Sequence, residues 1–358
     1  RLTLDYTNPT SLARIKNLFQ RMVTWSARQA LRWLRLENVE ALGPAHALLR
    51  GALAQPADLT ILHTEIPLWT AAKLTRAGRA VAADFEDWYS EDLLSADRCA
   101  RPLKLLRAAE KFALRHARYV STTSQSMAGA LVAAFDCAPP VVLRNVFPLQ
   151  TSSHLDRPAS NEMPAFVWFS QTIGPGRGLE LFLAAWSRTT TRSRVVLIGD
   201  ERPDYKEKLL RLLPSERRGL VNFLPFISPE KLPDKLTEFD IGLALEPNWP
   251  RNKDLTISNK IFQYLNAGLA IAATDTTGQS EVLRAAPESG LLIAAHDAGL
   301  LATQLDQLLS DANRLRAMQG AARRAAEQIF CWEREAPRLL EAVEHALART
   351  SSTASDRS

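Results

Sequence analysis

The sequence of 358 residues predicts an α/β protein with two successive parallel sheets. Short apolar runs rich in β-branched residues alternate with longer helical patterns, which is typical of βαβ units. The length corresponds to two domains at roughly 150 residues each. Residues 148–164 are polar, lack periodicity and contain prolines, so this segment is expected to separate the two sheets.

The individual elements follow from the apolar runs. Strands are expected at residues 2–6, 59–63, 80–83, 119–122 and 141–143 of the first half, and at 166–169, 195–198, 221–223, 241–245, 270–273 and 290–293 of the second. The clearest helical patterns cover residues 101–118, 178–187, 204–213, 258–266 and 299–309. We therefore expect an N-terminal domain over 1–155, a second domain over 164–325, a helix over 326–348 and a disordered polar tail over 349–358.

The composition excludes several classes of protein. A net charge of +5 is too small to indicate a nucleic-acid-binding protein. No run approaches the roughly 18 uncharged apolar residues of a membrane span, and no secretory signal precedes the first elements. The three cysteines show neither a disulfide framework nor zinc-ligand spacing. We expect a cytoplasmic protein that is not an integral membrane protein.

The net positive charge of the chain lies in its N-terminal half. Residues 1–150 hold 19 basic and 13 acidic residues, whereas residues 151–358 hold 25 and 26. Residues 11–36 contain no acid, and their basic residues are Arg14, Lys16, Arg21, Arg28, Arg32 and Arg35. On a helix they would lie beside apolar and aromatic surface, which is typical of a helix on an anionic membrane. The alternative is a solvated face over a core helix, because this chain uses 34 Arg and only 10 Lys.

Polar side chains end two predicted strands of the first half. They are His63 and Glu65 after one strand, and Asp84, Glu86, Asp87, Glu91 and Asp92 after the next. The carboxyl ends of parallel strands face the ligand in open α/β sheets, so His63 and Glu86 are candidates for chemistry. Asp84 and Asp87 can instead cap the following helix. Asn145, before the polar segment, is a further candidate or a solvated loop residue.

Two turns of the second half lead from a strand into a helix. The first, in FVWFSQTIGPGRGLELFLAAW, contains Arg177 among three glycines that allow close backbone approach, Gly174, Gly176 and Gly178. In the second, Ser258 or Asn259 can cap a helix and Lys260 can reach an anion. Two helix N-termini with basic neighbours predict a diphosphate site, although glycine-rich turns without ligands are also common.

These motifs resemble those of the family-4 retaining glycosyltransferases. In family order they are SQTIGPGRGLELFLAAW, VVLIGDE, VNFLPFISPEKLP, DIGLALEPN, ISNKIFQYLNAGLAIAATDTTGQSEVL and FCWEREAPRLLEAVEHAL, over residues 166–348; ADLTILHTEIPLWTAAKL, DFEDWYSED, AEKFALRHARYVSTTS and PPVVLRNV match more loosely. The resemblance implies the GT-B fold, with two Rossmann-like domains facing a central cleft. It also implies retaining hexosyl transfer from a nucleoside diphosphate sugar, without a metal or another cofactor.

The resemblance assigns roles to particular residues. Arg177 falls where the family has the cation that binds the donor diphosphate. The other donor-side positions are Ser170, Gln171, Gly174, Gly176, Phe226 near the base, Ser258, Asn259 and Lys260 in the turn, Gln263 near the ribose, and Glu281 in a loop after the next strand. His63 and Glu86 fall on the acceptor side, and with Arg177 they are the expected catalytic residues. Trp332 and Glu333 belong to the helix that, in this family, returns to the first domain.

The sequence departs from the family pattern at four places. Ser170-Gln171 replaces the usual Gly-Arg, so one of two diphosphate cations is missing. Gln263 and Leu255 replace two glutamates, and a neutral acceptor binds a hydroxyl less strongly than a carboxylate does. Glu86 stands where many members have a histidine. The family's first strand and Gly-rich loop either precede Arg1 or are missing from the protein.

The sequence therefore predicts a glycosyltransferase whose donor is a nucleoside diphosphate sugar and whose acceptor is a glycan or a lipid-linked molecule. If residues 11–36 bind an anionic membrane, we expect a peripheral protein on the inner face of that membrane. The departures favour an alternative, a glycosyltransferase-like binding or scaffold protein that has lost catalysis. A GT-B epimerase or phosphorylase is a third possibility, which the SNKIFQYLNAG turn fits less well.

Overall fold

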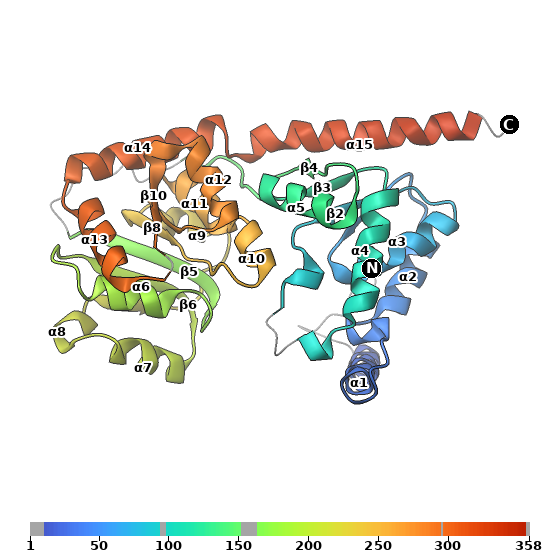
Figure 1. Cartoon of the computed structure of the whole chain (residues 1–358), viewed down its shortest axis with the longest axis horizontal. Helices are drawn as coiled ribbons and strands as arrows, with labels where there is room; N and C mark the ends of the chain where they lie inside the picture. The colour runs from blue at the N-terminus through green and yellow to red at the C-terminus, as the bar shows by residue number, and fades with distance from the viewer. Residues whose placement is uncertain (1–10, 94–97, 152–162, 295, 356–358) are drawn as a thin grey trace. The chain divides into compact units, whose positions relative to one another are not determined.

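The computed structural model describes residues 11–93, 98–151, 163–294 and 296–355, so the strand predicted at 2–6 lies outside the described residues. The chain divides into two compact units, Arg1–Leu143 with Arg338–Ser358, and Arg144–Pro337 (Figure 1). Each unit contains one parallel sheet with helices, as the alternating pattern predicts.

The first unit has a four-stranded parallel sheet in the order β1-β2-β3-β4. Its strands are β1 (Thr60–His63), β2 (Val81–Phe85), β3 (Val120–Thr122) and β4 (Val141–Val142). Its helices include α1 (Ser11–Leu34), α2 (Ala45–Ala54), α3 (Glu65–Arg76), α4 (Leu103–His116) and α5 (Gln125–Phe135), with short turns η1 (Val39–Ala41), η2 (Tyr89–Glu91) and η3 (Arg98–Ala100). Apolar side chains of η1, α2 and α4 form a common core with residues of α3.

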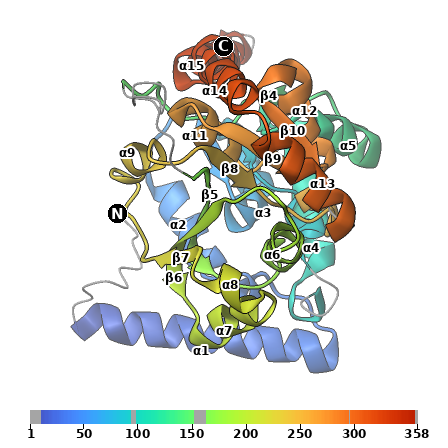
Figure 2. The same cartoon turned by 90° about the vertical axis from the view of Figure 1, so that its left-hand side faces the viewer.

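Helix α1, shown along its length in Figure 2, packs against η1. Gln20 Nε2 donates to Glu40 Oε2 at 2.8 Å, and Arg28 Nε donates to the carbonyl oxygen of Ala41 at 2.8 Å. Ala27 and Leu31 are buried on the same side of the helix. None of the helices in the described ranges qualifies as a membrane span by its length and hydropathy.

The second unit has a six-stranded parallel sheet in the order β10-β9-β8-β5-β6-β7. The strands are β5 (Ala165–Ile173), β6 (Arg194–Glu201), β7 (Val221–Leu224), β8 (Ile241–Ala244), β9 (Ala270–Thr274) and β10 (Gly290–Ile293). This order places β5 beside β8, and the chain leaves these two strands toward opposite edges of the sheet. Open α/β sheets bind ligands at such a switch point, beyond the carboxyl ends of the strands.

Helices cover both faces of this sheet, as Figure 1 shows for α6 and α7 on one side and α11, α12 and α14 on the other. One core joins α6 (Leu179–Trp186), α7 (Pro203–Arg211) and α13 (Ala298–Leu309) to the sheet. A second core joins α9 (Leu232–Leu236), α11 (Asn259–Ala267), α12 (Thr277–Ala285) and α14 (Ala312–Gln328) to the opposite face. The shorter elements are α8 (Ser215–Arg218), α10 (Arg251–Leu255) and η5 (Pro287–Ser289).

The units divide at Leu143 rather than at the predicted residue 155, because the next residues bond to the second unit. Trp332 N–H donates to the carbonyl oxygen of Phe147 at 2.9 Å, and Gln150 N–H donates to Asn266 Oδ1 at 3.0 Å. Helix α15 (Trp332–Ser355) begins in the second unit and continues among residues grouped with the first. Residues 349–355, for which the polar composition predicted disorder, prolong this helix, and residues 356–358 lie outside the described residues.

Candidate functional site

The turn after β5 begins with an irregularity in the strand. The register of β5 against β6 shifts between Phe169 and Thr172. Gly199 of β6 lies beneath this point, where a Cβ atom would come within 2.5 Å of the carbonyl oxygen of Ser170. The close approach requires glycine. It leaves Ser170 partly buried and Gln171 exposed, so the two residues predicted on the donor side differ in their access to solvent.

The turn then enters α6 through left-handed backbone. Gly176 and Gly178 have φ angles of +77° and +73°, which glycine adopts without strain. Gly178 is the N-cap of α6 and supplies no side-chain cap, so the first N–H groups of the helix keep their capacity to bind an anion. Gly174 and Arg177 are partly buried in the same turn. The predicted combination of helix N-terminus and guanidinium is therefore present.

At the start of α11, the surroundings of Lys260 differ from the expectation. Its Nζ lies 3.2 Å from Glu246 Oε1, and the two side chains are only 9% and 8% exposed. Ser258 Oγ donates to the same oxygen at 3.1 Å. The ammonium group also lies 5.8 Å from the centroid of the Trp168 ring. Lys260 is thus neutralised by a buried carboxylate, whereas the sequence predicted that it reaches an anion.

Glu246 is the second residue after β8, and sequence reasoning missed it. Its N–H donates to Thr274 Oγ1 at 2.8 Å, and that hydroxyl donates to the carbonyl oxygen of Glu246 at 2.7 Å. Burial alone would raise the pKa of Glu246, but the charges of Lys260, Lys253 and Arg177 outweigh it and lower the pKa below its ordinary value. The carboxylate is therefore ionised. A carboxylate at the carboxyl end of an apolar strand was the available signal.

The remaining donor-side residues are spread over three elements. Gln263 on α11 is partly buried, and its Oε1 has no hydrogen-bond partner among the described residues. Asn259 is exposed at the first position of α11. Phe226, after β7, is 43% exposed, which leaves its ring face available for stacking. Glu281 lies within α12, so its predicted place in a loop is wrong; the helix begins early because the Thr276 side chain caps it.

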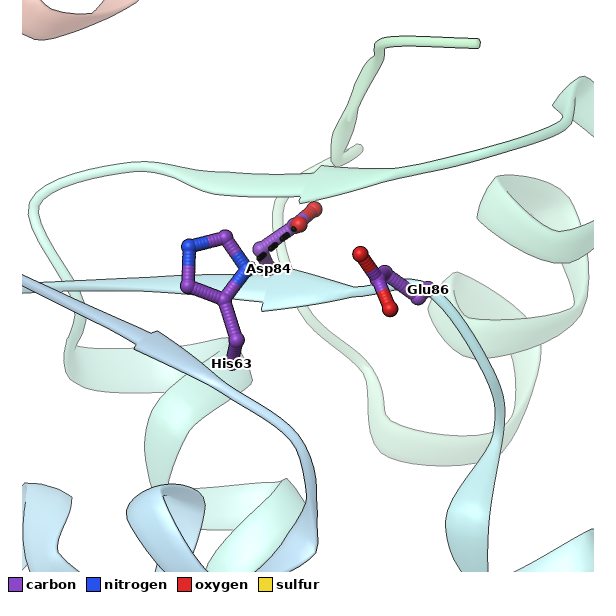
Figure 3. A group of neighbouring side chains, drawn as sticks. All are labelled: His63, Asp84 and Glu86. Atoms are coloured by element: carbon purple, nitrogen blue, oxygen red, sulfur yellow. Dashed lines mark ion pairs between the residues drawn. The ribbon is translucent and has the colours of Figure 1, made fainter. Parts of the chain in front are cut away.

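His63, Asp84 and Glu86 lie together at the carboxyl ends of β1 and β2, as Figure 3 shows. His63 Nδ1 is 2.9 Å from Asp84 Oδ2, and Ser121 Oγ donates to Asp84 Oδ1 at 2.7 Å. Asp84 therefore orients the imidazole, whereas the sequence offered a helix cap as its role. The ligand atoms of the three residues lie within 4.8 Å of one another, close enough to share a metal ion.

The environment of this cluster disfavours the ionised form of Glu86. Burial raises the pKa of Glu86, the negative charges of Asp84 and Asp87 raise it further, and His63 opposes them. Thr64, next to His63, has a φ of +65°, which is unusual for a β-branched residue. Such strained backbone often accompanies functional residues.

The residues predicted outside these two groups have simpler surroundings. Asn145 is exposed, and Trp332 is 42% exposed at the first position of α15. The carboxylate of Glu333 accepts the N–H of Leu149 at 3.2 Å, which ties the start of α15 to the beginning of the polar segment 148–164.

The comparisons with known proteins cover different parts of the chain. Residues 164–311 match the family model of the glycosyl transferases group 1. Spore coat protein SA of Bacillus subtilis (strain 168) is 24% identical over 146 residues, which cover 41% of this chain and 37% of that protein. The chain thus spans little more than a third of the length of this curated relative.

Solved structures resemble most of the chain. Sucrose-phosphate synthase from Thermosynechococcus elongatus superposes with a TM-score of 0.67 and 16% identity, over 85% of this chain and 77% of that one. The Anabaena protein HepE in complex with UDP gives a TM-score of 0.65 and 19% identity, over 86% and 83%. With its two parallel sheets the chain has the GT-B fold, and residues 164–311, less than half of the chain, are similar to the glycosyl transferases group 1 family.

Proposed function

We propose that the protein transfers a hexosyl group from a nucleoside diphosphate sugar to a glycan or lipid-linked acceptor, with retention and without a metal ion, in the cytoplasm. The observation that carries this proposal is the turn between β5 and α6. There the uncapped N-terminus of α6 and the guanidinium of Arg177 stand beside the switch point of the second sheet. A solved structure of the same fold contains UDP, which supports a nucleotide as the ligand.

The proposed chemistry follows from where charge develops. As the bond between the sugar and the diphosphate breaks, negative charge grows on the leaving phosphate. Preoriented N–H groups and a cation stabilise that charge most effectively, and Arg177 with the first turn of α6 supplies both. Gln263 is the proposed partner of a ribose hydroxyl; its Oε1 is buried and unpartnered among the described residues, so the amide has to turn toward the ligand. In the first unit, His63 and Glu86 bind the acceptor hydroxyl and its proton.

A second candidate function is that of a donor-binding protein without catalysis. Two observations favour it. Lys260 is already paired with Glu246, and the neutral Gln171 occupies the position of a second diphosphate cation. The fewer free cations there are, the less charge the site can stabilise on the leaving group.

One experiment separates these functions. The full chain is titrated calorimetrically with UDP, GDP and ADP and with their glucose and mannose conjugates, and the conjugate that binds is then incubated with the chain and simple glycan or lipid-linked acceptors. Binding followed by release of the nucleoside diphosphate supports the transferase. Binding without release or hydrolysis supports the non-catalytic alternative, and no binding of any nucleotide contradicts both.

We further propose that α1 lies on an anionic membrane surface. Seven large apolar side chains of this helix are 60% to 74% exposed, namely Ile15, Leu18, Phe19, Met22, Trp25, Trp33 and Leu34. Spacings of three, four and eight residues relate the first six, which places them on one face, opposite the buried Ala27 and Leu31. Exposed arginines, including Arg14 and Arg32, flank this stripe. An apolar stripe with basic neighbours is suited to the boundary between lipid headgroups and acyl chains.

Replacing Arg14 and Arg32 with glutamine is expected to weaken vesicle binding. Each basic residue near an anionic surface contributes about 1 kcal/mol, so the double change lowers the partition coefficient roughly 30-fold at low salt. The measurement is cosedimentation with vesicles of equal parts phosphatidylglycerol and phosphatidylcholine. The matched control replaces the exposed Arg188 and Arg192 of the second unit with glutamine. Equal recovery of both double variants with the vesicles would contradict the proposal.

A further inference from the structure

We infer that Glu246 binds the sugar of the donor, its carboxylate accepting a hydrogen bond from a hydroxyl of the group that is transferred. This inference rests on the proposed function and names a residue that determines which sugar is accepted.

The position of Glu246 brings it to the donor side of the second sheet. It follows β8, which pairs directly with β5 at the switch point. The residue before it, Leu245, lies against the turn that carries Arg177, since a Cβ atom at Gly178 would come 3.3 Å from the Cβ of Leu245. The charge of Arg177 also lowers the pKa of the Glu246 carboxylate. A sugar nucleotide whose diphosphate lies on Arg177 and the start of α6 extends its sugar from that same region.

The carboxylate keeps capacity to bind a further group. Both of its contacts, with Ser258 Oγ and with Lys260 Nζ, use Oε1. Within the part of the chain that the structure describes, no side chain or N–H is recorded on Oε2. The side chain is 8% exposed, so its neighbours hold it in place and a small part of its surface remains accessible. An ionised oxygen with a fixed position is a strong acceptor for a hydroxyl group.

A purely structural pairing with Lys260 does not account for this charge. Replacing a buried ion pair with apolar side chains of similar volume is often neutral or stabilising, so packing alone does not require one. A carboxylate near a diphosphate site also repels the ligand's own negative charge. In the proposed arrangement, the hydrogen bond from a sugar hydroxyl to the Glu246 carboxylate offsets this repulsion.

Other groups near the turn are less suited to this role. The two family positions for glutamate carry Leu255 and the neutral Gln263. The carboxylate of Asp254 accepts the N–H and the hydroxyl of Thr277, at 3.0 and 2.6 Å. That of Asp275 accepts the Ser280 hydroxyl at 2.7 Å. Glu246 combines a negative charge, a place beside Arg177 and an oxygen without a recorded partner.

The test compares a nucleotide with and without its sugar. Calorimetric titrations of the full chain use UDP and UDP-glucose, or the corresponding GDP or ADP pair if the wild type selects that base. Glu246→Gln keeps the size of the side chain and an acceptor for Ser258 and Lys260. We expect it to bind the sugar nucleotide about tenfold more weakly, because a neutral acceptor replaces a charged one. The affinity for the nucleoside diphosphate alone should stay the same or rise, because Lys260 loses its counter-charge.

Two further variants protect the interpretation. Asp254→Asn removes a negative charge from α10 and is expected to leave both affinities unchanged. Glu246→Asp keeps the negative charge but places the carboxylate oxygens farther from the site. It should show the same selective loss of affinity for the sugar nucleotide. This variant serves as the test if Glu246→Gln does not fold. Equal weakening of both ligands in the Glu246 variants would overturn the inference. A wild type that binds no nucleotide would instead remove the proposed function.

Discussion

Replacing Arg177 with alanine is expected to weaken the binding of a nucleoside diphosphate by roughly 10- to 100-fold, since one charge-assisted hydrogen bond contributes about 1.5–3 kcal/mol. The loss should be at the upper end of this range because the neighbouring cation, Lys260, is paired with Glu246. Without Arg177 the diphosphate keeps the N–H groups of α6 but meets the negative charge of Glu246 with less compensation. Isothermal titration calorimetry with the nucleotide that the wild type prefers measures the effect.

The matched control for this prediction is Arg188→Ala. Arg188 is exposed just after the other end of α6, so the control removes the same charge from the opposite end of this helix without touching the turn. It should change nucleotide affinity less than twofold. Raising the salt concentration should narrow the difference between the Arg177 variant and the wild type, since ions screen the contribution of an exposed charge. Equal affinities of the two variants at low salt would contradict a role for Arg177.

Glu110 is expected to make the stability of the first unit depend strongly on pH. It lies on α4 with no exposed surface, and its Oε1 accepts the N–H of Ser90 at 2.9 Å. Its Oε2 has no partner among the described residues. Burial raises the pKa of Glu110 from 4.5 to about 7. The folded state therefore holds a proton that the unfolded state has already released between these two values.

The sign of the effect follows from this difference. The contribution of Glu110 to stability is fully present below pH 4.5 and is lost as the pH rises to about 7. The total loss amounts to roughly 3 kcal/mol, at 1.36 kcal/mol for each pKa unit. Glu110→Gln keeps an acceptor for Ser90 and has no proton to lose, so its free energy of unfolding should lack this decline.

Urea unfolding at several pH values between 4.5 and 8 measures the slope. The control, Asp58→Asn, changes an exposed carboxylate of the same unit and should retain the decline of the wild type. If the wild type and Glu110→Gln lose stability in parallel over this range, the carboxyl of Glu110 does not hold its proton in the folded state.

Most strands were predictable because apolar runs and strand burial coincide in parallel sheets. Residues 290–293 were placed without error, since β10 is a short apolar run between polar neighbours. Strand β5 instead continues to Ile173, beyond the predicted end at residue 169. Its last part, Ser-Gln-Thr, is polar because the strand leaves the core at the bulge, so hydrophobicity alone could not mark its end.

The buried face of α1 was not predictable from hydrophobicity. The aromatic residues Trp25 and Trp33 are exposed, whereas the polar Asn17 is 8% exposed on the side that faces the unit. A periodic pattern shows that a helix has two faces. It does not show which face meets the protein when the apolar one is directed elsewhere.

The chemistry of the site was predictable in kind but not in its pairings. The sequence showed a lysine at the start of a helix, and Lys260 is there. It could not show that Glu246 neutralises this lysine, because the pairing depends on how β8 and α11 pack. The bond between His63 and Asp84 likewise joins two strands that are adjacent only in the folded sheet.

The close approach of Gly199 to Ser170 makes the shape of the turn between β5 and α6, the proposed donor site, depend on a residue that no ligand needs to touch. Any side chain at position 199 would push the carbonyl of Ser170 outward and carry Gln171 with it. Position 199, in the interior of β6, therefore constrains the shape of the turn from beneath. A directed-evolution library that includes position 199 should find glycine nearly invariant there among nucleotide-binding clones.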